Sequence, residues 1–179
     1  MAVTLVLGVS GFTLAANIGR DLKLRVAKRR LGAYERLWAL MRPASPYSYP
    51  LDTDGRQQLH SSFTDWYYQN GDGMLLEQLS RNVYFEAKDN LTRPVEEITP
   101  GESRERLSRL SGTDLEAERG RLAQRQLSLL RTQLKSDLAI FGRPYGPRLG
   151  EEDKAFLEHC HVDINRKPWR EAADPHNSA

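Results

Sequence analysis

The chain has 179 residues and a net charge of +2, and its soluble part is long enough for one domain. The positive charge is concentrated: residues 20–42 carry eight basic and two acidic side chains, whereas the remainder carries 18 basic and 22 acidic ones. Nucleic-acid-binding domains usually spread positive charge over their surface, so no nucleic-acid partner is expected. The single cysteine excludes an intrachain disulfide and is compatible with a reducing cytoplasm.

Residues 1–19 contain no charged side chain and are predicted to form a transmembrane helix. The apolar run reaches the lower bound of about 17 residues for a helix that spans a bilayer. Basic residues follow this run and none precede it, so the positive-inside rule places the C-terminal side in the cytoplasm. The sequence therefore predicts a single-pass membrane protein with its N-terminus outside and a cytoplasmic domain.

Three other interpretations of residues 1–19 stay open. A secretory signal peptide would need a positive N-terminal region and a small-residue cleavage site, and both are poor here. A soluble helical oligomer would bury the segment in its own core, as short apolar runs also do. A translation start further upstream would lengthen the span.

Residues 20–42 are predicted to continue the same helix as a basic stalk, because no helix breaker occurs before Pro43. Basic side chains next to a membrane segment are attracted to anionic lipid headgroups. The candidates for this contact are Arg20, Lys23, Arg25, Lys28, Arg29 and Arg30.

An apolar stripe with three- and four-residue spacing runs along the stalk. Its members are Leu24, Ala27, Leu31, Tyr34, Trp38 and Met41. Such a stripe packs either on helices of the same chain or on a partner, including a second copy. The candidate protein-interaction residues are Leu24, Leu31, Tyr34, Trp38 and Met41.

Residues 43–53 are rich in proline and are predicted to form an extended linker. Two helices should follow, over about 54–70 and 76–91, separated by the turn Gly71-Asp72-Gly73. A connection this short predicts an antiparallel hairpin. The expected inward-facing residues are Leu59, Phe63, Trp66 and Tyr67 on the first helix, and Leu76, Leu79, Val83, Ala87 and Leu91 on the second.

The region from 94 to 112 is polar, and we expect a mobile loop with at most a short helix. Thr113 and Glu116 match a capping box that starts a long helix reaching about Phe141. Its predicted apolar stripe is Ala123, Leu127, Leu130, Leu134, Leu138 and Phe141. We expect this helix to lie side by side with the stalk.

The expected fold is all-α: an N-terminal transmembrane helix continues into an amphipathic stalk that packs with a helical hairpin and a long C-terminal helix. The predicted cytoplasmic helical domain covers residues 54–141. The tail, 142–179, should be partly disordered and hold a short helix over about 151–159.

No catalytic, cofactor or metal site is predicted. The cluster from Glu158 to Asp163 contains metal-competent side chains, but adjacent residues of a helix point apart, and structural zinc sites use more widely spaced ligands. Cys160 would need a base held by the fold to act as a nucleophile. Phosphate-loop, dinucleotide, zincin and nucleophile-elbow motifs are absent from the sequence.

The segments AYERLWALM at 33–41 and DWYYQNGDGMLL at 65–76 resemble those of a family of small uncharacterised bacterial proteins with a membrane anchor and a helical domain. The resemblance covers about residues 1–91 and implies a bacterial source and a genuine membrane helix. It assigns no role to any residue.

We therefore expect a non-enzymatic scaffold or interaction protein at the cytoplasmic face of a bacterial membrane. Its expected partners are a bilayer with anionic headgroups and either an unidentified protein or a second copy. The alternative is a membrane-tethered enzyme or ligand-binding domain with a pocket near Trp66, Tyr67 and Tyr84.

Overall fold

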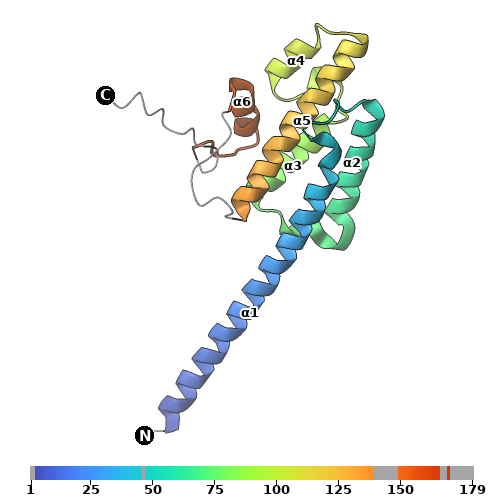
Figure 1. Cartoon of the computed structure of the whole chain (residues 1–179). Coiled ribbons are helices and arrows are strands. Elements are labelled where there is room, and N and C mark those ends of the chain that lie inside the picture. Colours follow the sequence, from blue (N-terminus) through green and yellow to red (C-terminus); the bar gives the residue numbers. More distant parts are fainter. Residues whose placement is uncertain (1–2, 46, 139–148, 166–168, 170–179) are drawn as a thin grey trace, which may run out of the picture.

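The computed structural model describes residues 3–45, 47–138, 149–165 and 169, and of residues 3–18 it describes the backbone alone. Six α-helices and three short 3-10 helices occur in this part of the chain, and no strand does. The predicted all-α class is confirmed. One long helix, α1, extends out of a bundle formed by its own C-terminal end with α2, α3 and α5 (Figure 1).

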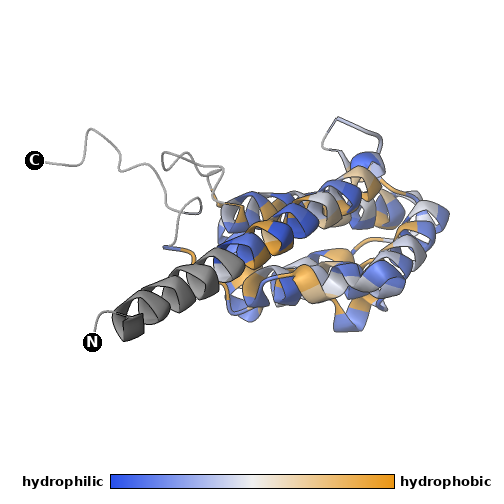
Figure 2. Ribbon diagram, turned by 90° about the horizontal axis from the view of Figure 1, so that it is seen from below, coloured by the Kyte–Doolittle hydropathy of each residue, from blue (hydrophilic) through white to orange (hydrophobic). Residues whose placement is uncertain are grey.

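Helix α1 runs unbroken over Val3–Leu40, as the stalk prediction requires. At 1.5 Å per residue its 38 residues span about 57 Å. Residues 20–29 are exposed, and burial begins with Ala33 and Tyr34. Figure 2 shows hydrophilic residues mixed with hydrophobic ones where α1 enters the bundle.

None of the helices that the structure describes is long and apolar enough to cross a bilayer. The side chains of residues 1–18, on which the predicted span depends, lie outside the described part of the chain.

Helices α2 (Thr53–Tyr68) and α3 (Gln78–Asn90) form the predicted hairpin. Asp52 caps α2 by accepting a hydrogen bond from the Gly55 amide at 2.8 Å. The 3-10 segment η2 (Gln69–Leu75) joins the two helices and includes Gly71 at φ 71°, a left-handed conformation that glycine adopts without strain. The hairpin core contains Leu59, Phe63, Trp66, Leu76, Val83, Tyr84, Ala87 and Leu91.

The short helix allowed for within 94–112 is present as α4 (Gly101–Leu107), but the expectation that the region is otherwise a mobile loop is wrong. This region forms η3 (Val95–Glu97) and α4, which pack on α5. Ile98 and Leu107 are buried with Leu122 in a small second core. The few apolar residues of this polar stretch are too widely separated to give a periodic signal, so sequence patterning did not detect this packing.

Helix α5 covers Gly112–Asp137, and its start differs from the prediction. Ser111, rather than Thr113, is the N-cap residue, and no side chain caps it. The Glu116 carboxylate instead accepts hydrogen bonds from Thr53 at 2.5 Å and Arg56 at 2.8 Å. The capping box therefore does not form, because Glu116 joins α5 to the start of α2. Phe141 lies outside the described residues.

The last part of α5 lies beside the C-terminal part of α1, where Tyr34 donates to Asp137 at 3.0 Å and Arg131 donates to the Met41 carbonyl at 3.1 Å. The closest backbone packing of α5 is on α3 rather than on α1. The short helix α6 (Glu151–His159) occurs at its predicted position.

The buried face of the stalk is rotated relative to the predicted stripe. Tyr34 and Met41 are buried as predicted, and they are joined by Ala33 and Leu37. The other members of the predicted interaction set, Leu24, Leu31 and Trp38, are 63%, 44% and 39% exposed. The side chain of Trp66 donates a hydrogen bond to the Ala33 carbonyl at 3.2 Å, so α2 covers this face of α1. The rest of the stripe stays partly exposed.

Candidate functional site

Three arginines attach α1 to the hairpin turn. Arg29 donates to the Asn70 carbonyl at 2.6 Å, and Arg30 pairs with Glu77 at 2.7 Å. Arg36 donates to both oxygens of the Asp72 carboxylate, whose residue is 2% exposed. These contacts fix the direction in which α1 leaves the bundle.

The six predicted membrane-contact residues are thus divided by the structure. Arg29 and Arg30 bind the hairpin turn, as described above. Arg25 pairs with Asp21 one turn away at 2.8 Å, and both of these side chains are exposed. Together with Arg20, Lys23 and Lys28, which are also exposed, Arg25 lies on the projecting part of α1.

A network of buried polar groups connects α1 with α3 and α5. The Asp137 carboxylate accepts hydrogen bonds from Tyr34 at 3.0 Å, from Gln133 at 3.0 Å and from the Ser80 hydroxyl. Burial raises the pKa of Asp137 despite these three donors, and burial beside this carboxylate also raises the pKa of Tyr34. Because Tyr34, Ser80 and Gln133 are buried, the network is closed to solvent and acts in packing.

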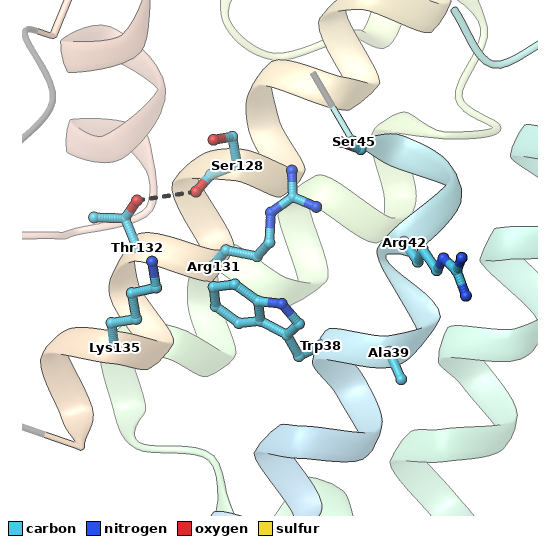
Figure 3. Close-up of a pocket in the computed structure, with 8 residues that line it drawn as sticks. All are labelled: Trp38, Ala39, Arg42, Ser45, Ser128, Arg131, Thr132 and Lys135. Carbon is cyan, nitrogen blue, oxygen red and sulfur yellow. Dashed lines mark hydrogen bonds between the residues drawn. The ribbon is translucent and has the colours of Figure 1, made fainter. Parts of the chain in front are cut away.

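A cleft lies between the partly exposed face of α1 and α5. Its polar end has a volume of about 460 Å³ and is lined by Trp38, Ala39, Arg42, Ser45, Ser128, Arg131, Thr132 and Lys135 (Figure 3). The side chains of Trp38, Arg131 and Lys135 gather on one side of α1, whereas the guanidinium of Arg42 points away from them. The ammonium of Lys135 lies 4.9 Å from the centroid of the Trp38 ring, which is a cation–π distance.

Arg131 is the half-buried cation of this polar end. Its guanidinium donates to the carbonyls of Met41 and Ala44, each at 3.1 Å, and so holds the chain just after the end of α1. Burial lowers the pKa of Arg131. No carboxylate among the described residues forms an ion pair with it.

The apolar end of the cleft has a volume of about 360 Å³ and shares Trp38 and Lys135 with the polar end. Its other lining residues are Leu31, Tyr34, Glu35, Leu134 and Leu138. The two ends therefore adjoin. Together they form a surface with cations and hydroxyls at one end and mainly apolar side chains, with Glu35 among them, at the other.

The alternative prediction placed a pocket near Trp66, Tyr67 and Tyr84. Neither end of the cleft described above is lined by these residues. The rings of Tyr67 and Phe63 stack on Tyr84, with centroids 5.7 and 5.4 Å away. Tyr84 is fully buried, and its hydroxyl donates to the Phe63 carbonyl at 2.6 Å. These rings fill the hairpin core, because stacked aromatic side chains bury a large apolar area.

The cluster near Cys160 does not assemble into a site within the described part of the chain. No three potential metal-binding side chains converge there or elsewhere among these residues. Burial raises the pKa of the Cys160 thiol to about 12, which disfavours the nucleophilic thiolate.

Sequence patterning identified Leu31 and Trp38 as candidate contacts but missed the opposite wall. Ser128, Arg131, Thr132 and Lys135 recur at three- and four-residue spacing on α5, which places them on one face of the helix. A polar helix face usually faces solvent. This one forms the wall of a cleft only because α1 lies opposite it.

Comparisons of the chain with protein-family models, curated proteins and solved structures found no match.

Proposed function

We propose that this protein is a membrane-anchored, non-enzymatic interaction protein at the cytoplasmic face of a bacterial membrane. In this proposal residues 1–19 insert into the bilayer and the helical bundle is held beneath it. The observation that carries the proposal is the projection of α1 from the bundle as a lone, basic helix whose residues 20–29 are exposed.

An isolated helical segment of ten residues is marginal in water, because helix nucleation is costly and short helices gain few hydrogen bonds. The projecting segment therefore needs support at both of its ends. The arginine contacts with the hairpin turn support one end, and insertion of the uncharged run would support the other. The segment would then act as a spacer of about 15 Å with basic residues facing anionic headgroups.

The partly exposed apolar side chains of α1 favour an interaction role over a purely structural one. Leu31 and Trp38 line the cleft beside α5 and stay 44% and 39% exposed. Grouped apolar side chains on a small domain are typical of interaction sites.

Membrane fractionation tests the anchor directly. The full chain should stay in the membrane pellet after washing with high salt and with carbonate. Replacing Leu7 and Val9 together by Arg should release it, because a charge at mid-span costs about 2.5–3.5 kcal/mol per residue on insertion scales. The matched control replaces the same two residues by Ala and should remain in the pellet.

If the arginine variant stays in the membrane pellet as fully as the wild-type chain does, the proposed membrane anchor is contradicted. A wild-type chain that stays in the supernatant without detergent would contradict it as well. That second result would favour the soluble oligomer that buries residues 1–19.

A further inference from the structure

We propose that the cleft between α1 and α5 binds a single-chain amphiphilic anion, with its acidic head at Arg131 and its alkyl chain along Trp38 toward Leu138. The chemical class is an alkyl carboxylate or alkyl phosphate. This goes beyond the interaction role proposed above and does not depend on membrane insertion.

The polar end provides what an anionic head requires. A guanidinium has five N–H donors in a planar fork that fits carboxylate and phosphate oxygens. Two N–H groups of Arg131 donate to the carbonyls of Met41 and Ala44, and this leaves further donors on the same side chain. A half-buried charge without a carboxylate partner is costly, and an anion in the cleft would compensate it. The hydroxyls of Ser45 and Ser128 lie at the same end.

The apolar end provides a surface for an alkyl chain. Leu31, Leu134 and Leu138 line it together with Tyr34 and Glu35, and the Trp38 ring forms the boundary with the polar end. The acidic Glu35 at this end places the anionic head at Arg131 rather than here. Arg131 and Leu138 are seven residues apart on α5, a separation of about 10 Å, which an extended chain of about eight carbons covers.

Other occupants satisfy only one end of the cleft. A purely apolar ligand leaves Arg131 uncompensated, and inorganic phosphate leaves the leucines in water. An amphiphilic cation would meet the positive charges of Arg131 and Lys135. A second copy of the chain would bring the same positive charges together across an isologous interface, which is unfavourable.

The position of the cleft favours an amphiphile taken from water over a lipid still in the bilayer. Trp38 lies 18 residues beyond Arg20 on a continuous helix, a distance of about 27 Å. If residues 1–19 are inserted, this distance keeps the cleft clear of the headgroup layer.

Tryptophan fluorescence offers a direct test, because one of the three tryptophans reports on the cleft. Trp38 is 39% exposed, whereas Trp66 and Trp169 are 4% and 1% exposed. The full chain, in nanodiscs of zwitterionic lipid if it inserts and in buffer if it does not, would be titrated with octyl phosphate, octanoate, octyltrimethylammonium and inorganic phosphate. We expect a saturable blue shift with the two anionic amphiphiles and none with the cation or with phosphate alone.

Chain length and substitutions make the test specific. From butyl to octyl phosphate the affinity should rise about two- to fourfold per methylene, and it should level off beyond about ten carbons. Arg131→Gln should weaken binding of octyl phosphate at least about tenfold, as loss of a charged partner does. Lys28→Gln removes a charge outside the cleft and should leave binding unchanged.

A second pair of variants covers the case in which Arg131→Gln unfolds the end of α1. Leu31→Gln changes a 44% exposed side chain at the apolar end and should weaken octyl phosphate binding several-fold. Leu24→Gln makes the same change two turns earlier, outside the cleft, and should have no effect.

Equal responses to octyl phosphate and octyltrimethylammonium would overturn the proposal, and so would unchanged binding in Leu31→Gln. A Trp38 signal that changes with protein concentration instead of amphiphile would assign the cleft to a second copy. None of these results depends on the fractionation experiment, so the two proposals fail separately.

Discussion

Arg36 and Asp72 form a bidentate ion pair that joins the middle of the stalk to the hairpin turn, with distances of 2.9 Å from Nε and 2.8 Å from Nη2. The two partners differ in environment: the Asp72 side chain is 3% exposed, whereas that of Arg36 is 53% exposed. The pair connects the exposed face of α1 to a carboxylate held inside η2.

This asymmetry gives the first prediction. Arg36→Ala should lower the melting temperature by several degrees more than Asp72→Ala, because it leaves a buried carboxylate without a partner. Asp72→Ala leaves an arginine that water can solvate. Thermal unfolding followed by circular dichroism would measure the difference, and a larger effect of Asp72→Ala would contradict this account.

The second prediction concerns the two faces of the stalk. Leu37→Ala should reduce the free energy of unfolding by about 2–5 kcal/mol, because Leu37 is fully buried. Trp38→Ala should cost less than about 1.5 kcal/mol, since the ring is 39% exposed and loses mainly its contact with Lys135. Urea unfolding of both variants would test the assignment, and equal losses would show that Trp38 belongs to the core.

Asp137 gives a prediction about pH. Its pKa is raised above the ordinary value of 3.8 by burial, so the folded state holds the proton more tightly than the unfolded state does. The Asp137 contribution to stability is therefore most favourable in acid. It declines as the pH rises from the unfolded pKa through the raised folded pKa.

Asp137→Asn removes this titration while keeping the side chain nearly isosteric. The stability of the wild type relative to the variant should be greater at pH 4.5 than at pH 7.5 when both are unfolded in urea. A difference that is constant, or that grows toward pH 7.5, would show that the carboxylate is not held in an unfavourable environment.

The fourth prediction separates membrane contacts from packing contacts among the basic residues. Replacing Arg20, Lys23 and Lys28 by Glu should weaken or invert the topology without lowering the melting temperature of the bundle, because all three are exposed. Accessibility of a C-terminal tag in spheroplasts would report the topology. Arg30→Glu serves as the comparison: it places two carboxylates together at Glu77 and should destabilise the bundle.

The hairpin and α6 could be predicted from sequence because their signals are local. Asp52 caps α2, Gly71 supplies the left-handed turn, and residues of each helix repeat on one face. Each of these signals depends on neighbours within a few residues, and the structure agrees with them.

The face of α1 that is buried could not be predicted in the same way. The stripe from Leu24 to Met41 and the buried set around Ala33 and Leu37 overlap, and the choice between them depends on where α2 and η2 lie. Glu116 is a similar case. It does not cap α5, because its carboxylate forms an ion pair with Arg56, a residue 60 positions away. The contact of Arg131 with the Met41 carbonyl, 90 positions away, likewise depends on how α1 and α5 are placed and has no local signal.

Because α1 is an uninterrupted helix, it also determines the rotational orientation of the bundle about the helix axis. Each residue of an α-helix turns the chain by about 100°, so the length of the projecting segment determines which way the cleft faces around the membrane normal in a chain anchored by residues 1–19. Inserting one residue between Arg20 and Lys28 would swing the cleft through roughly a quarter-turn or slightly more. Inserting seven would return it to nearly its original heading about 10 Å further from the bilayer.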